Sequence, residues 1–300
     1  MSRVVIVGGS VIDLFLYPHQ KMKLKDSNPG YLKKSLGGVG RNIAENLARL
    51  GLDVTLITPL GHDSYKDLIT NQAQQIGLSI LPIDINETPT YVSVIDEKGE
   101  DLIGVALMDE IQSITIDQVL KHQSLLDEAE LLVLDTNLSE GVLRGLLERY
   151  KDKTYVDAIS GQKAFKLKTL LPFIHTLKMN LIEAKTIAGF GDSSCEGLDK
   201  LGDFFISKGT REVFITLGDK GVYYANREVA LSRSSVSLKP INSTGAGDAF
   251  FSGVIYATLH QKDHISYGIA NAYLNLLDEK AVCQNLSSRL IENTVKELNL

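Results

Sequence analysis

Apolar residues along the chain follow two alternating patterns. Continuous apolar stretches predict strands buried on both faces, and the clearest is the β-branched run from Arg3 to Val7. Further strands are predicted at 53–58, 131–134, 154–157, 176–180 and 213–217. Apolar residues at helical spacing predict helices at 43–50, 65–76, 141–150, 198–208, 249–259 and 265–277. This alternation predicts an α/β fold with a doubly wound, mostly parallel sheet sandwiched by helices.

Two segments, 14–36 and 90–107, depart from this rhythm. The first mixes short alternating pieces with Pro18 and Pro29, which predicts two short strands outside the main sheet. The second places two short strands around the turn 96–100, which is typical of a hairpin. We expect these strands to form a small lid; a decorative edge sheet or a dimer contact are alternatives. Without an internal repeat or long linker, residues 1–300 are predicted to form a single domain.

Composition limits the partners and the compartment. The 300 residues are 44% hydrophobic and carry a net charge of −6, so we expect neither nucleic acid nor anionic membranes as partners. No apolar run approaches the roughly 20 residues that span a bilayer, and Gly8 and Gly9 come too early for a signal peptide. The cysteines, Cys195 and Cys283, form no C-x-x-C pair and favour a reducing compartment. We therefore expect a cytoplasmic protein.

The segment 241–250 carries the most informative chemistry. Gly245, Ala246 and Gly247 follow a polar turn and precede an apolar helix. Backbone N–H groups in such a turn can approach a ligand closely, and the helix start adds unpaired donors, which together make an anion hole. The carboxylate of Asp248 beside this hole could take a proton from a hydroxyl. The segment therefore predicts phosphoryl transfer to a hydroxyl, although a glycine turn with a helix-capping aspartate is an alternative.

Other polar side chains follow predicted strands or open a helix. Asp13 follows the first strand and could bind sugar hydroxyls, or it could be a turn residue. Asn42 lies near the start of the helix after Gly37-Gly38, where its amide could bind a hydroxyl. Asn137 ends the group Asp135-Thr136-Asn137, which closes the strand at 131–134 and could meet a ligand.

Asn180 and Glu183 stand three residues apart at the end of the strand 176–180. If a helix begins there, both side chains face one way, and Glu183 could hold a water-shelled Mg²⁺. A capping box, with Asn180 as cap and Glu183 at the third position, is an equal alternative. Farther along, Gly218 and Gly221 permit close approach of a flat ring or a phosphate, although a simple hairpin turn also explains them.

Several motif classes are absent from the sequence or incomplete in it. No Gly-Lys-Ser/Thr occurs, which excludes a Walker-type NTPase, and no H-E-x-x-H spacing suggests a zinc hydrolase. The pair Gly38 and Gly40 resembles a dinucleotide-binding fingerprint only in part, because Ile43 replaces the third glycine and no buried strand precedes it. We therefore do not expect an NAD site.

Three motifs in fixed order resemble the ribokinase-like, pfkB-type carbohydrate kinase family. They are Gly37-Gly38-x-x-x-Asn42, Asn180-x-x-Glu183 and Thr244-Gly245-Ala246-Gly247-Asp248. The resemblance covers essentially the whole chain, including the lid segments. It implies a ribokinase-like fold and ATP-dependent transfer of the γ-phosphoryl group to a hydroxymethyl group of a sugar or nucleoside, with Mg²⁺ as cofactor.

The resemblance also implies a role for each matching residue. The catalytic base is matched by Asp248, and the anion hole by Gly245, Ala246 and Gly247. The Mg²⁺ and triphosphate region is matched by Asn180 and Glu183, the nucleotide-binding turn by Thr216 and Gly218, and the position near adenine by Asn271. The positions that bind sugar hydroxyls are matched by Asp13, Gly38 and Asn42.

Within this family, the stretch 38–51, the lid segment 91–100 and the residues Asn137 and Asn242 are most similar to the branch that acts on pseudouridine. This implies a 5′-hydroxyl acceptor. Met108 lies near a position where that branch leads us to expect a polar Asn, so another sugar or nucleoside stays open, as does a binding protein without catalysis. Asn242 replaces an Asp, which leaves monovalent-cation (K⁺) activation open. Exposed strand edges and the resemblance together predict a homodimer through the lid.

Overall fold

The computed structural model describes residues 3–97, 99–190 and 197–300. Within these ranges a nine-stranded sheet dominates, and its neighbouring strands from β11 to β5 pair in parallel, whereas β12 and β13 pair antiparallel at one edge. In spatial order its strands are β13 (Ala230–Arg233), β12 (Val222–Asn226), β11 (Glu212–Thr216), β10 (Thr176–Asn180), β9 (Thr154–Asp157), β8 (Leu131–Asp135), β1 (Arg3–Val7), β4 (Asp53–Leu60) and β5 (Ser79–Asp84).

Helices cover both faces of this sheet. Successive residues of a strand point to opposite sides, so a continuous apolar strand has two apolar faces that must be covered. Val4 and Ile6 belong to one apolar cluster, with helices α1 (Val39–Arg49), α2 (Ser64–Gln75), α9 (Ala246–Leu259), α10 (His264–Leu276) and α11 (Ser288–Glu297). Val5 and Val7 belong to the other, with α3 (Ile116–Leu120), α4 (Gln123–Glu128), α5 (Glu140–Tyr150), α6 (Gly161–Ala164), α7 (Leu181–Ala188) and α8 (Leu198–Ser207). The predicted doubly wound arrangement is therefore confirmed.

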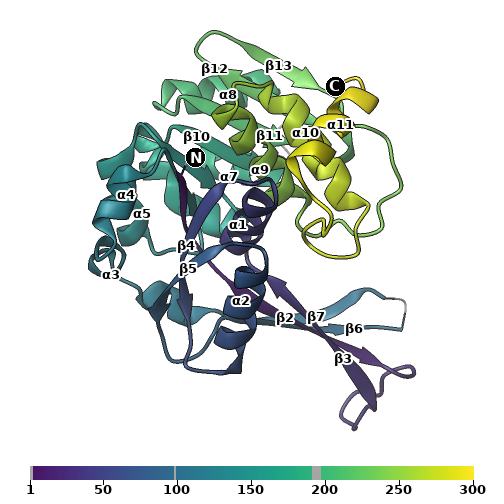
Figure 1. Cartoon of the computed structure of the whole chain (residues 1–300). Coiled ribbons are helices and arrows are strands. Elements are labelled where there is room, and N and C mark those ends of the chain that lie inside the picture. The colour runs from purple at the N-terminus through teal and green to yellow at the C-terminus, as the bar shows by residue number, and fades with distance from the viewer. Residues whose placement is uncertain (1–2, 98, 191–196) are drawn as a thin grey trace.

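A second, smaller sheet projects from one end of the molecule (Figure 1). Its strands, in spatial order, are β3 (Gly30–Gly37), β2 (Val11–Pro18), β6 (Thr90–Ile95) and β7 (Asp101–Leu107). Strands β2 and β6 pair in parallel and the outer pairs are antiparallel. The predicted small sheet is thus confirmed, although β2 begins at Val11, before the expected lid segment.

Some elements lay outside the prediction for identifiable reasons. Strand β5 is the edge of the large sheet, holds Pro82 and alternates irregularly between exposed and buried positions, so its apolar signal is weak. Helices α3 and α4 are too short to repeat an apolar spacing.

Cys283 is a free, buried thiol, whereas Cys195 lies outside the described residues. No helix in the described ranges is long and apolar enough to cross a membrane.

Candidate active site

The start of α9 has the backbone geometry of an anion site. Gly245 caps this helix with φ at +78°, a left-handed conformation in which a side chain would also run into the carbonyl of Ala281. Helix α9 begins at Ala246, whose N–H donates to the carbonyl of Ser243 at 3.4 Å, whereas the N–H groups of Gly247 and Asp248 have no backbone acceptor among the described hydrogen bonds. These groups and the positive end of the helix dipole suit a phosphate. The anion-hole role of Gly245, Ala246 and Gly247 is compatible with this geometry and stays a prediction.

Asp248 lies in that first turn with only 8% of its surface exposed. Its Oδ2 accepts a hydrogen bond of 2.8 Å from the side-chain amide of Asn42. Burial, reinforced by the charge of Asp157, raises the pKa of Asp248 to about 7, against the opposing effects of Lys178 and Asn42. A carboxyl group with a pKa near neutrality is well suited to accept a proton from a hydroxyl.

A buried ion pair lies beneath the glycine turn and was not predicted. Lys178 Nζ and Asp157 Oδ2 are 2.9 Å apart, and both side chains are almost fully buried. A methyl group added at Gly247 would lie 2.6 Å from the same ammonium, so the charge is directly under the turn. Burial alone would lower the pKa of Lys178, but the carboxylates of Asp157, Asp248 and Glu183 outweigh it and raise that pKa. The signal in the sequence was a lysine in the middle of the predicted strand 176–180.

Asn180 and Glu183 form a capping box at the start of α7. Glu183 N donates to Asn180 Oδ1 at 2.9 Å, and Asn180 N donates to Glu183 Oε2 at 2.8 Å. The structural alternative for this pair is therefore present. Since Glu183 also lies close enough to Lys178 to affect its pKa, the cap belongs to the same charged cluster as Asp248.

The residues present fit a Mg²⁺ ion that arrives with a triphosphate. Among the described residues, no group of three His, Cys, Asp or Glu side chains could hold a metal. Mg²⁺ keeps several waters and often takes only one or two protein carboxylates beside substrate phosphates. Glu183, whose pKa is raised by burial, and Asn180 lie at the right end of the sheet for that limited role.

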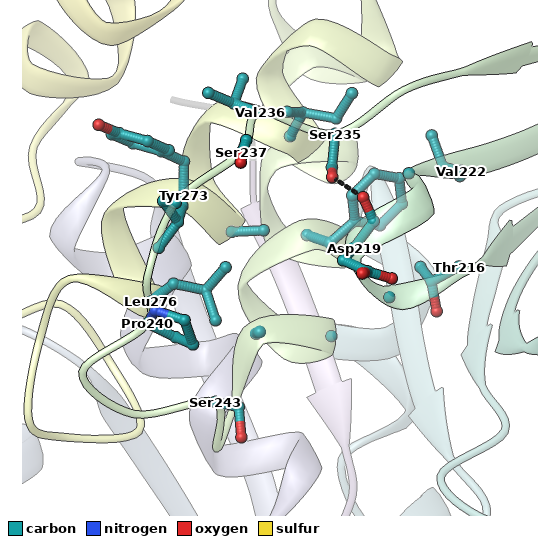
Figure 2. Close-up of a pocket in the computed structure, with 18 residues that line it drawn as sticks. Thr216, Asp219, Val222, Ser235, Val236, Ser237, Pro240, Ser243, Tyr273 and Leu276 are labelled. Atoms are coloured by element: carbon teal, nitrogen blue, oxygen red, sulfur yellow. Dashed lines mark hydrogen bonds between the residues drawn. The ribbon is translucent and has the colours of Figure 1, made fainter.

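A cavity of about 580 Å³ opens beside the glycine turn and fits a nucleotide in size (Figure 2). Ala246 and Gly247 form part of its wall. In the view, Tyr273 and Pro240 lie on one side, and Thr216 and Asp219 lie on the other. The remaining lining residues are Gly218, Gly221, Val222, Ser235, Val236, Ser237, Leu238, Ser243, Phe250, Ile269, Ala272 and Leu276. The predicted nucleotide residues Thr216, Gly218 and Gly221 therefore share one cavity.

Asn271 does not line this cavity, unlike its neighbour Ala272. Its side chain is fully buried, and its Nδ2 donates to Asn46 Oδ1 at 3.2 Å and to the carbonyl of Ala249 at 2.8 Å. The amide thus ties α10 to α1 and α9 from the inside. Of the residues of this helix, Ile269, Ala272, Tyr273 and Leu276 line the cavity instead.

The predicted sugar-binding residues gather where the small sheet joins the large one. Asp13 lies in β2, and its carboxylate is against Gly37, where an added methyl group would collide with it. Burial raises the pKa of Asp13 to about 6, although the nearby guanidinium of Arg41 opposes this. Gly38 caps α1, and Asn42 follows one turn later, bonded to Asp248. Through Asn42, the region that holds Asp13 and Gly38 therefore connects to Asp248.

The end of β8 is partly committed to internal contacts. Asp135, expected to be free for a ligand, is fully buried and accepts hydrogen bonds from the N–H groups of Gly9 and Gly40, at 2.8 and 2.9 Å. That expectation was wrong, because the carboxylate satisfies buried backbone donors. Asn137 is also buried, and its Oδ1 accepts a bond of 2.6 Å from Lys163 Nζ. Lys163 is thus a further polar group at this end of the site.

Known proteins resemble this chain over most of its length. A profile for the pfkB family carbohydrate kinases matches residues 1–276. The pseudouridine kinase of Escherichia coli K12 is 35% identical over 256 residues, which cover 84% of this chain and 82% of the relative. A solved carbohydrate kinase from Agrobacterium tumefaciens superimposes with a TM-score of 0.86 at 28% identity, covering 99% of this chain and 97% of the other. For Arabidopsis thaliana ribokinase complexed with ribose and ATP, the TM-score is 0.85 at 19% identity, with 99% of each chain covered.

Proposed function

Since the chain belongs to the pfkB family of carbohydrate kinases and is a phosphotransferase acting on a sugar or nucleoside hydroxyl, we propose that it phosphorylates the 5′-hydroxyl of pseudouridine with ATP. One observation carries the chemistry: Asp248, bonded to Asn42 of α1, directly follows a glycine turn that opens onto the nucleotide-sized cavity. This arrangement supports a reaction in which Asp248 acts as base beside an anion site and a nucleotide cavity.

The proposed reaction uses Asp248 as general base. Its Oδ2 already accepts the Asn42 bond, which leaves Oδ1 for the acceptor hydroxyl. The hydroxyl oxygen attacks the γ-phosphorus while its proton passes to Asp248, the new O–P bond forms, and the bond to the leaving ADP breaks. The first-turn N–H groups of α9 and the buried charge of Lys178 stabilise the negative charge on the transferred group.

ATP and its metal ion would occupy the other half of the site. Kinases of this fold use ATP with Mg²⁺, and the ion, when bound, neutralises charge on the phosphates. We assign the nucleotide to the cavity lined by Thr216, Gly218 and Gly221. Asn180 and Glu183, at the start of α7, would hold the hydrated ion and the triphosphate.

The acceptor assignment rests on similarity and on the polar groups at the lid junction. The relative at 35% identity is a pseudouridine kinase, whereas a ribokinase of Staphylococcus aureus and a guanosine-inosine kinase of Exiguobacterium acetylicum are each 23% identical. Asp13, Gly38 and Asn42 would bind the ribose hydroxyls. Asn137 would face the nucleobase of the acceptor, while Lys163 Nζ donates to the side-chain carbonyl of Asn137.

A homodimer through the lid is also part of the proposal. Leu32, Leu16, Val94 and Ile103 lie opposite one another across all four strands, so the small sheet carries an apolar row on one face. Leu16, Leu32 and Ile103 are 39%, 43% and 57% exposed. A second copy that covers this row would remove the apolar surface from water.

A panel of acceptors tests the function. Purified protein with Mg²⁺ and ATP is given pseudouridine, uridine, ribose or adenosine, and ADP release and the phosphorylated product are measured. We expect the highest kcat/KM for pseudouridine. A higher value for ribose or adenosine would replace the acceptor assignment, and binding of any of them without ATP turnover would overturn the kinase proposal.

A further inference from the structure

Helix α1 contains a buried ion cluster that the reaction described above does not use. Arg41 is 4% exposed and Glu45, one turn later, is 1% exposed, and the two side chains form an ion pair. Arg49 completes the cluster with a second ion pair of 2.8 Å to Glu45. Burying three charged side chains is costly, so the cluster calls for an explanation beyond folding.

Arg41 uses its remaining donors on groups next to the proposed site. Its guanidinium donates to the carbonyl of Leu36 at 2.9 Å, to Asn42 Oδ1 at 3.0 Å and to Gln72 Oε1 at 3.0 Å. Arg49, in contrast, donates to Gln284 and makes no contact with Asn42 among the described hydrogen bonds. The two arginines therefore share Glu45 but differ in what they position.

The contact with Asn42 has a consequence for the base. An asparagine amide has an oxygen that only accepts hydrogen bonds and a nitrogen that only donates, in nearly the same shape. A guanidinium has donors only, so Asn42 turns its oxygen to Arg41 and its NH₂ group to Asp248. We propose that Arg41 is a positioning residue of the kinase reaction, which fixes the Asn42 amide so that it donates to Asp248. The inference rests on the proposed role of Asp248 as base.

The opposite orientation would place the amide oxygen against the carboxylate of Asp248. Two acceptors would then face each other in a buried site, and the base would be more stable in its protonated form. The charged groups that face Asp248 from the sheet are Asp157, Lys178 and Asp135, so Asn42 is the donor supplied from α1. With the amide fixed by Arg41, Asp248 stays ionised over a wider pH range.

The same guanidinium also reaches the root of the lid. Leu36 is the penultimate residue of β3, and its carbonyl accepts from Arg41 at 2.9 Å. The charge of Arg41 also opposes the rise that burial causes in the pKa of Asp13. One side chain thus holds the end of a lid strand and Asn42, and stabilises the ionised form of a proposed ribose-binding residue.

Two matched variants test the proposal. Arg41→Met and Arg49→Met each remove one guanidinium from Glu45, but only the first releases Asn42. We expect Arg41→Met to lower kcat at least about tenfold, as a misplaced reacting group does, and to move the acid limb of the kcat profile to higher pH. The KM for ATP should stay unchanged in both variants, and Arg49→Met should keep the wild-type pH profile. Equal effects of the two variants on kcat and on the pH profile would overturn the proposal.

A second measurement needs no acceptor. The pKa of Asp248 can be followed by NMR of the ¹³C-labelled carboxyl group, and we expect a higher value in Arg41→Met than in Arg49→Met. If Arg41→Met does not fold, the pair Glu45→Gln and Glu45→Gln/Arg41→Met gives the same comparison without the buried carboxylate. Failure of the wild type to phosphorylate any acceptor would reject the proposed function, whereas equal Asp248 pKa values in the paired variants would reject the role of Arg41.

Discussion

Asn42 donates a hydrogen bond of 2.8 Å to Asp248, although the two residues are 206 positions apart in the sequence. The bond joins the first turn of α1 to the first turn of α9, two helices that belong to one apolar cluster. The half of the site that would bind the acceptor and the half that would bind the phosphates therefore share one carboxylate. Substitutions at this junction are expected to affect catalysis more than stability.

Asp248→Asn should lower kcat by at least about a hundredfold, because the variant keeps the shape of the side chain but loses the proton acceptor. The variant should fold, since an amide in this position avoids a buried charge. Steady-state ADP release with a saturating acceptor measures the loss. Asp263→Asn is the matched control, because Asp263 caps α10 and an Asn caps a helix equally well. Near wild-type turnover by Asp248→Asn would show that another group is the base.

The pH profile of kcat should show a base whose pKa lies well above that of an ordinary carboxyl group. Catalysis needs ionised Asp248, whose pKa burial raises from 3.8 to about 7, so kcat should fall as the pH drops through about 7. Saturating acceptor separates this limb from that of Asp13, whose pKa of about 6 would affect acceptor binding. A kcat that is constant down to about pH 5 would contradict the assignment of Asp248.

Stability gives an independent check of the same pKa. A carboxyl with a folded pKa above its unfolded value stabilises the fold at low pH, and this contribution is lost as the pH rises through the folded pKa. Wild type should therefore lose stability relative to Asp248→Asn between about pH 4 and about pH 7. Denaturant unfolding across that range measures the difference, which would be constant if Asp248 titrated normally.

Much of the fold followed from the sequence because its strands are uninterrupted. Strands β9 and β10 have the predicted bounds, and the family and ribokinase-like fold are confirmed. The site was predicted less completely, because tertiary packing decides where a polar side chain points. Asn271 stands one residue before the cavity-lining Ala272, and helical geometry turns it into the core. Nothing local distinguished the two.

Charged residues inside regular elements were the main signal that the sequence analysis missed. Lys178 lies in a central strand and Arg41 on a helix that also carries Glu45 four residues later. Lys178 is neutralised by Asp157 of the neighbouring strand, a pairing that spacing cannot predict, whereas Arg41 and Glu45 follow the i, i+4 spacing of one helix and were overlooked. The capping box of Asn180 and Glu183 shows the converse, since the local motif that the sequence offered as an alternative is present, while the proposed chemical role of the pair stays a prediction.

Gly247→Ala should reduce catalysis without a large loss of stability. The added methyl group would lie 2.6 Å from Lys178 Nζ and would displace this ammonium, which is the end of a flexible side chain. We expect kcat to fall about tenfold or more, because the charge under the phosphate site moves. Gly141→Ala in α5 is the control, since its methyl group meets open space and should leave kcat unchanged. Equal kcat values for the two variants would show that the charge of Lys178 does not act on the phosphate site.

Glu183→Gln separates the capping role from a role near Mg²⁺. Glutamine also serves at the third position of a capping box, so α7 should keep its start. We expect the Mg²⁺ concentration for half-maximal activity to rise at least about tenfold, as loss of a group near a metal does. Magnesium-dependent binding of ATP, measured by calorimetry, provides a readout without turnover. If both Mg²⁺ dependences match the wild type, Glu183 is only a cap.

Ile103→Lys should convert a lid-mediated dimer into a monomer. Ile103 lies in the apolar row that includes Leu16 and Val94, so a dimer interface there would bury the new ammonium without a partner. Ala106→Lys is the control, because Ala106 is also exposed, pairs with Tyr91 in the regular part of β7 and, three residues after Ile103, points to the opposite face. Light scattering after size exclusion gives the mass of each. A monomeric wild type would exclude the lid dimer. Two dimeric variants would place the subunit contact elsewhere, because an interface on this row could not accommodate a buried lysine.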